Sequence, residues 1–195
     1  MVARGLHGVV ASLIPRGKGK LLNLGCENWM PAEGHEDMTP ELLEGKEYEI
    51  YNVDAQDRPL PNLHVFDLDQ PWHLPDNEFD VVLSVELIEH LENPWHHARE
   101  IARVMKPDGV CILTTPNILA PFKRELWDEG YFNWFGPGEW AVPLHERGHI
   151  NPMPIHELRK IFNDGDFRGV HTRIEKELYH PPEVKECVVL VIRRR

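Results

Sequence analysis

The sequence predicts a doubly wound α/β fold, in which helices cover both faces of a mainly parallel sheet. Apolar, strand-like runs recur along the chain and helical segments separate several of them, as in parallel sheets. Two of these runs, Val81–Val85 and Val110–Leu113, are almost continuously apolar, which is typical of strands covered on both faces. The expected strands are Lys20–Leu24, Glu49–Val53, Leu63–Phe66, Phe79–Val85, Val110–Thr115 and Cys187–Ile192.

Local signals place three helices before or between these strands. Asn93 followed by Pro94 is an N-cap residue with proline at the first helical position, and apolar residues then recur at helical spacing up to Met105. A second helix is expected at Pro154–Asn163, and the segment Met1–Pro15 is expected to contain a short lead-in helix. The final apolar run follows a tight turn, which favours an antiparallel last strand.

Composition limits the class of protein and its partners. With 195 residues, 42% of them hydrophobic, the chain 1–195 is expected to form a single domain. No apolar stretch approaches the ~20 residues that a membrane span needs. The formal net charge of −11 makes nucleic acid an unexpected partner, because its phosphates would be repelled. We therefore interpret the basic run Arg193–Arg195 as a solvated tail.

The cysteines indicate a reducing compartment. The chain has three, widely spaced in the sequence, which fit neither a disulfide framework nor a zinc site. We therefore expect a cytoplasmic protein. The oligomeric state stays open at this stage.

The loop after the first expected strand has some features of a nucleotide site and lacks others. Gly25 follows the apolar run Leu21–Leu24 and allows the chain to turn sharply. A nucleoside-binding loop would place another glycine at position 27, where this chain has Glu27. Asp54 follows the second strand, at the sheet edge where ligands of open α/β sheets bind and where an acid commonly accepts ribose hydroxyls.

Motifs between Lys20 and Asn117 resemble those of class I S-adenosylmethionine (SAM)-dependent methyltransferases. The matching segments are LNLGC, NVD, FDLDQPWHLPDNEFD, VMKPDG and TPN. Within that superfamily they look most like bacterial methyltransferases of glycan and small-molecule pathways. The resemblance implies a Rossmann-like, mainly parallel seven-stranded sheet with an antiparallel last strand, and SAM as the cofactor.

The same resemblance assigns residues to the cofactor. Gly25 and Cys26 would line the methionine end of SAM. Asp54 would hold the ribose diol, and Asp67 with Leu68 would meet the adenine. The expected cofactor-binding residues are Gly25, Cys26, Glu27, Asn28, Asp54, Asp67, Leu68 and Ser84.

Two further positions concern the reacting end of that pocket. The resemblance places Ser84–Glu86, at the end of the fourth strand, on the floor of the pocket near the transferred methyl group. Glu27 departs from the family pattern, because its carboxylate would lie near the carboxylate of SAM unless it swings outward or pairs with the amino group. The sequence leaves open whether this loop binds the cofactor or is a degraded one.

Glu86, Glu89 and His90 form an E-x-x-E-H pattern directly after the fourth strand. If the chain is helical there, this spacing places the three side chains on one face. Two carboxylates and an imidazole suit Mg²⁺ or Mn²⁺, and His149 would be the fourth ligand. The ubiquinone-biosynthesis O-methyltransferases and the small-RNA 3′-terminal 2′-O-methyltransferases, which the pattern resembles, pair this element with a later histidine to hold a metal.

Two other roles stay open for these residues. Without a metal, His90 or His149 would be the general base, with Glu86 completing the catalytic group. Alternatively, Glu86 contacts the cofactor and the other two residues of the pattern only cap a helix. His96 and His97 lie on the expected Asn93–Met105 helix, where we expect them to be exposed.

The function expected is SAM-dependent O-methylation of a small-molecule or glycan hydroxyl. An aromatic-rich segment at about 117–149 is too long for a plain connection and is expected to form a lid or acceptor wall. The alternatives are RNA 2′-O-methylation, or a non-catalytic methyltransferase fold that uses the aromatic segment to bind a partner. A nicotinamide-dependent oxidoreductase would need a G-x-G-x-x-G loop, which the sequence lacks.

Overall fold

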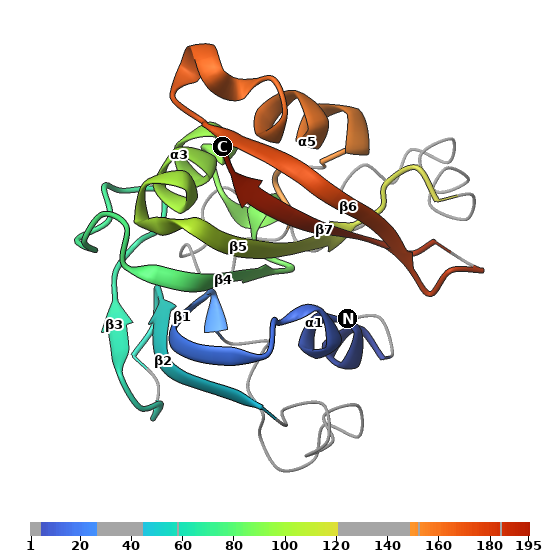
Figure 1. Cartoon of the computed structure of the whole chain (residues 1–195). Coiled ribbons are helices and arrows are strands. Elements are labelled where there is room, and N and C mark those ends of the chain that lie inside the picture. Colours follow the sequence, from blue (N-terminus) through green and yellow to red (C-terminus); the bar gives the residue numbers. More distant parts are fainter. Residues whose placement is uncertain (1–4, 27–44, 58, 121–148, 152, 184) are drawn as a thin grey trace.

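A computed structural model describes residues 5–26, 45–57, 59–120, 149–151, 153–183 and 185–195 of the chain. Its centre is a seven-stranded sheet with the strand order β3-β2-β1-β4-β5-β7-β6 (Figure 1). The strands are β1 (Gly17–Leu24), β2 (Lys46–Asp54), β3 (Leu63–Val65), β4 (Phe79–Val85), β5 (Met105–Pro116), β6 (Thr172–His180) and β7 (Cys187–Arg194).

The pairing of the strands confirms the predicted fold class. The neighbouring pairs from β3 through β5 are all parallel, and β7 runs antiparallel to both β5 and β6. The sheet is therefore mainly parallel, with an antiparallel last strand. The strand order reverses between β1 and β4, and in open α/β sheets the crevice beyond the carboxyl ends at such a point is where ligands bind.

Strand β6 is the one strand that the sequence did not reveal. Its sequence, TRIEKELYH, is rich in charged residues, and most of its side chains are half-buried or exposed. The strand lies at the edge of the sheet, where charged residues prevent pairing with other chains. These charges obscure the apolar pattern by which the other strands were found.

Helices cover both faces of the sheet, as predicted (Figure 1). On one face, α1 (Leu6–Leu13) packs on the side chains of β1 and β4 that belong to one apolar cluster, including Leu21 and Leu83. On the other face, α3 (Pro94–Val104) and α5 (Ile155–Phe162) pack on the alternate side chains of the same strands. Short 3₁₀ helices are η2 (Ile88–His90) and η4 (Gly165–Arg168).

The expected cap of α3 is present, but the last three arginines are not a solvated tail. Asn93 accepts the backbone N–H of His96 at 2.9 Å, which satisfies a donor at the start of the helix. Arg193 pairs with Glu175, Arg194 donates to the carbonyl of Met105, and Arg195 pairs with Asp166. Strand β7 continues through Arg194, so pairing with neighbouring elements holds these side chains in place.

Several predictions fall outside the described residues. Glu27 and Asn28 lie there, as does the aromatic segment apart from residues 117–120 and His149. The lid and the single-domain organisation of 1–195 therefore stay predictions. Within the described ranges, no helix is long and apolar enough to cross a membrane.

Candidate functional site

Gly25 begins the loop at the carboxyl end of β1, and the geometry there requires a glycine. Its φ of 62° lies in the left-handed region, which side chains strain to adopt. A Cβ atom at this position would lie 2.8 Å from Cδ1 of Leu87, which follows β4. The backbone N–H of Gly25 donates to the carbonyl of Val53 at 2.9 Å. The glycine thus lets the chain at the end of β1 pack closely between the end of β2 and the residue Leu87 that follows β4.

Cys26 and Asp54 meet just beyond Gly25. Both side chains are buried, and Sγ of Cys26 lies 3.6 Å from Oδ2 of Asp54. The other carboxylate oxygen of Asp54 accepts the backbone N–H of Gln56 at 3.0 Å. These contacts hold an acceptor-only carboxylate at the carboxyl end of β2, where the sequence analysis placed the ribose-binding acid.

The loop after β3 is held by its own side chains. Oδ1 of Asp67 accepts the backbone N–H of Asp69 at 2.9 Å. The carbonyl of the buried Leu68 accepts Nε1–H of Trp72 at 3.0 Å. The carboxylate of Asp69 in turn accepts the backbone N–H groups of Glu92 and Asn93, which fixes this loop to the start of α3. The two residues expected at the adenine therefore lie in an anchored loop.

Ser84 is buried, and its partner is a histidine of α3. His97 was expected on the exposed side of α3, but its side chain is fully buried, and Nε2 lies 2.9 Å from Oγ of Ser84. The rings of His97 and Trp72 meet edge to face, with centroids 5.4 Å apart. The signal was available, because the apolar Ile101 and Val104 follow His97 at i+4 and i+7 and mark the same buried face.

Burial keeps His97 neutral and selects one tautomer. Desolvation, with a smaller contribution from His96, lowers the pKa of His97 to about 3. In the part of the chain that the structure describes, Nδ1 has no hydrogen-bond partner. Because an unpaired donor is costly when buried, the hydrogen belongs on Nε2, which then donates to Oγ of Ser84. The Ser84 hydroxyl is thus held from the α3 side of the sheet.

Glu86 does not share a helix face with Glu89 and His90, which corrects one sequence expectation. The helix η2 begins only at Ile88, and Glu86 precedes it with a φ of 48°. Its backbone N–H bonds to the carbonyl and hydroxyl oxygens of Thr114 at 3.1 and 3.0 Å. The Thr114 hydroxyl donates to Oε1 of Glu86 at 2.9 Å. This buried carboxylate is therefore fixed against the end of β5.

The other three residues of the expected site do come together. Each of Glu89, His90 and His149 offers one atom, and these atoms all lie within 4.8 Å of one another. The two imidazole rings meet edge to face, with centroids 4.6 Å apart. Nε2 of His149 lies 3.9 Å from Oε1 of Glu89. His90 and His149 thus share one site although they are 59 positions apart in the sequence (149 − 90).

Glu89 is the residue that organises this cluster. Its side chain is buried and accepts the Thr115 hydroxyl at 2.9 Å. Its backbone carbonyl accepts the N–H groups of Ile150 and Asn151, both at 2.9 Å, and so docks the segment that carries His149. The two threonines at the end of β5 were not among the expected site residues. Their only sequence signal is a pair of hydroxyls that ends an apolar run.

The fold is that of a doubly wound α/β protein whose described site residues gather at the carboxyl edge of the sheet. A family described as "Methyltransferase domain" matches residues 8–172. The chain therefore belongs to the methyltransferase domain family, as its motifs predicted, and SAM is the cofactor of this class.

Individual relatives agree with this assignment. The chain is 32% identical over 108 residues to 27-O-demethylrifamycin SV methyltransferase of Amycolatopsis mediterranei, covering 51% of this chain and 40% of that protein. It is 30% identical over 84 residues to a ubiquinone biosynthesis O-methyltransferase of Caulobacter vibrioides, covering 40% and 33% of the two chains. This chain thus spans less than half the length of these relatives.

A solved structure supports the fold. An S-adenosylmethionine dependent methyltransferase from Mesorhizobium loti superposes with a TM-score of 0.61, covering 95% of this chain and 96% of that chain. The two sequences are 14% identical. The likeness therefore concerns the arrangement of the sheet and helices.

Proposed function

We propose that this protein is a SAM-dependent methyltransferase that transfers the methyl group to a hydroxyl of a small molecule or glycan. The observation that carries the proposal is the family match over residues 8–172, together with a glycine turn and a buried carboxylate at the ends of β1 and β2. The names of two relatives favour oxygen as the acceptor atom. One is a ubiquinone biosynthesis O-methyltransferase, and the other is a 27-O-demethylrifamycin SV methyltransferase.

The residues at the carboxyl edge suit SAM chemically. The backbone of Gly25 approaches a ligand without a side chain in the way. The carboxylate of Asp54 can accept two ribose hydroxyls, because an ionised carboxylate only accepts hydrogen bonds. Asp67 and Leu68 would contact the adenine. They lie in the anchored loop that follows β3, the strand beside β2 in the sheet. Ser84 would close the floor of the pocket, with its hydroxyl held by His97.

The proposed chemistry needs alignment and a proton acceptor. SAM, when bound, supplies a methyl group activated as a sulfonium. In-line transfer of that methyl group to a hydroxyl oxygen, with cleavage of its carbon–sulfur bond, would release the hydroxyl proton, and Nε2 of His149 would accept it. The products are the methyl ether and neutral S-adenosylhomocysteine. Glu89, with Oε1 3.9 Å from that nitrogen, would stabilise the imidazolium that forms.

A divalent cation is the second way in which the same residues could activate the acceptor. A carboxylate and two imidazoles with ligand atoms within 4.8 Å suit Mn²⁺, and Mg²⁺ if the acceptor adds oxygens. Such a cation would lower the pKa of a bound hydroxyl. Glu86 is outside this group, since its carboxylate bonds to Thr114, so the proposed ligands are Glu89, His90 and His149.

Calorimetric titration with SAM and S-adenosylhomocysteine tests the cofactor proposal, with and without Mg²⁺. Asp54→Asn should weaken binding at least about tenfold, or about 1.4 kcal/mol, because a neutral amide replaces the acceptor of the ribose hydroxyls. Asp57→Asn is the matched control, since Asp57 is exposed in the loop that follows the same strand. Absence of binding to the unmodified protein would reject the proposed activity and indicate a fold retained for another use.

A further inference from the structure

A hollow lies at the opposite edge of the sheet from the proposed cofactor site. It has a volume of about 610 Å³, within the range of roughly 300–1,000 Å³ that is typical of small-molecule sites. Its walls come from the start of β1 at Gly17 and Lys18, the start of β4 at Asp80, the start of β5 at Gly109, and the end of β7 at Arg193. The cofactor residues follow the other ends of β1 and β4, so the two sites are distinct.

One wall of the hollow is fixed by Asp80. Its Oδ2 accepts the backbone N–H of Lys20 at 2.9 Å and the ammonium of Lys106 at 2.8 Å. A Cβ atom at Gly19 would lie 2.2 Å from that same carboxylate oxygen, so only glycine leaves room for it. Burial raises the pKa of Asp80, but these hydrogen bonds outweigh burial, and the net effect lowers it. The negative charge of Asp80 is thus balanced by Lys106 within the protein.

Positive charge exceeds negative charge around the hollow. Four cations face two carboxylates there, although the whole chain carries −11. Two of the cations, Arg16 and Lys18, are exposed, and neither has an ion-pair partner among the residues that the structure describes. The charged residues of the hollow are Arg16, Lys18, Lys106, Arg193, Asp80 and Asp108.

Lys46 is a further cation close to Arg16. Burial lowers the pKa of Lys46, and the nearby Arg16 lowers it further. Lys46 itself donates to the carbonyl of Ala11 and is not among the residues that line the hollow. The region therefore combines two like charges that repel each other, which an anion would relieve.

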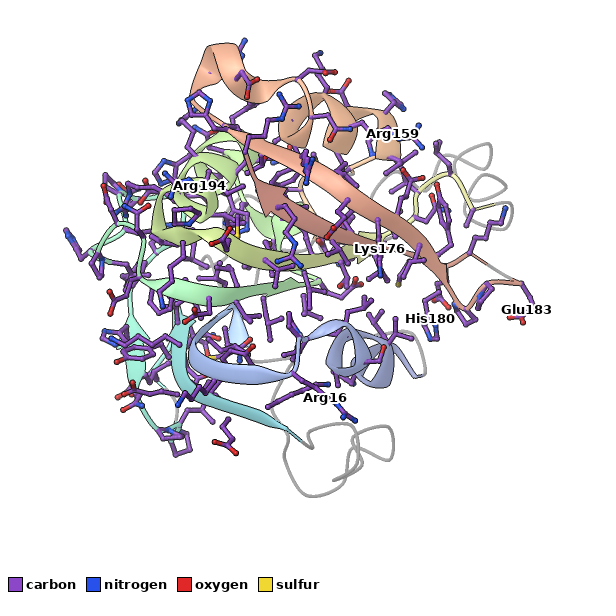
Figure 2. All side chains as sticks on the ribbon, viewed as in Figure 1. Arg16, Arg159, Lys176, His180, Glu183 and Arg194 are labelled. Atoms are coloured by element: carbon purple, nitrogen blue, oxygen red, sulfur yellow. The ribbon has the colours of Figure 1, made fainter. Side chains whose placement is uncertain are left out.

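We propose that this hollow binds the phosphoryl group of a small molecule, with Arg16 and Lys18 as its charged contacts. A guanidinium matches a phosphate through two parallel hydrogen bonds, and an ammonium adds a mobile point charge. Tyr48 and Pro107 give the hollow less polar walls for the rest of the molecule, and the Tyr48 hydroxyl is held by the carbonyl of Pro15 at 3.2 Å. Figure 2 shows Arg16 beside the start of β1.

Titrations monitored by amide chemical shifts test this site, with inorganic phosphate and ribose 5-phosphate as separate probes. The amides of Gly17, Lys18 and Gly109 should shift on saturation. Tighter binding of ribose 5-phosphate would assign the site to a phosphorylated metabolite, and equal binding would assign it to free phosphate. Absence of shifts at these amides with both probes would overturn the proposal.

Two double variants separate the site from general electrostatics. Arg16→Gln with Lys18→Gln should weaken binding of the tighter probe at least about tenfold, or about 1.4 kcal/mol. Lys160→Gln with Lys176→Gln removes the same charge from exposed positions of α5 and β6 that do not line the hollow, and should change it less than about twofold; Figure 2 labels Lys176. Equal loss in both variants would reject the site. Thermal unfolding of both variants verifies that they are folded.

Discussion

The buried histidine of α3 makes the stability of this protein depend on pH. In the folded protein burial lowers the pKa of His97 to about 3, whereas an unfolded chain has a histidine pKa of about 6.5. Between these two values the unfolded state binds a proton that the folded state does not. The free energy of unfolding therefore falls as the pH drops below 6.5, and the full contribution of His97 is present only above that value.

The size of the effect follows from the two pKa values. At pH 5 the unfolded histidine is protonated almost completely, which stabilises the unfolded state by about 2 kcal/mol, at roughly 1.4 kcal/mol per pH unit. Because His97 is fully buried, solvent screening does not reduce this figure. Lowering the pH from 7 to 5 should therefore remove about 2 kcal/mol of stability through this residue alone.

Urea unfolding at pH 7 and pH 5 measures this contribution when wild type is compared with His97→Gln. Glutamine does not titrate and can still donate to Ser84, so the variant should lose about 2 kcal/mol less between the two pH values. His96→Gln is the control, since His96 lies on the same helix and is only half-buried. If His97→Gln and wild type lose the same stability, the reasoning from burial to pKa is refuted.

Two further predictions concern the carboxyl edge of the sheet. Gly25→Ala should lower the free energy of unfolding by about 1–3 kcal/mol, because its φ is 62° and the new Cβ would lie 2.8 Å from Leu87. Gly45→Ala is the control for the φ angle alone, because Gly45 has a φ of 72° but its new Cβ would lie 3.6 Å from the nearest side-chain atom. An equal loss of stability in both variants would exclude the clash with Leu87. His149→Gln should abolish methyl transfer to a hydroxyl acceptor and leave the affinity for S-adenosylhomocysteine unchanged. Loss of wild-type activity with EDTA, restored by Mn²⁺, would assign His149 to a metal, and insensitivity to EDTA would assign it to proton transfer. Unchanged turnover in the variant would remove His149 from the mechanism.

Local signals in the sequence were sufficient for most of the fold. The continuous apolar run at β4 and the Asn-Pro cap of α3 are short-range features, and they predicted these elements within one or two residues. Strand β6 was missed because an edge strand can carry charges on most positions, which removes the alternation that identifies a strand. The terminal arginines were misread for a related reason, since their acidic and carbonyl partners are distant in sequence.

The candidate site divides in the same way. The sequence by itself was enough to identify the family. The motifs that did so include Gly25 and Asp54, which lie where strands end. It did not determine which side chains meet. Helical spacing predicted that Glu86 would join Glu89, but a left-handed φ at Glu86 turns its carboxylate toward Thr114.

Only the tertiary structure decided the environment of each polar group. Docking of residues 150 and 151 on the carbonyl of Glu89 brings His149 to His90, and the packing of α3 on the sheet buries His97 against Ser84. Burial and charge partners depend on which elements pack together in space. A linear sequence therefore fixes the kinds of groups that this protein can use, and the folded chain decides their neighbours and protonation states.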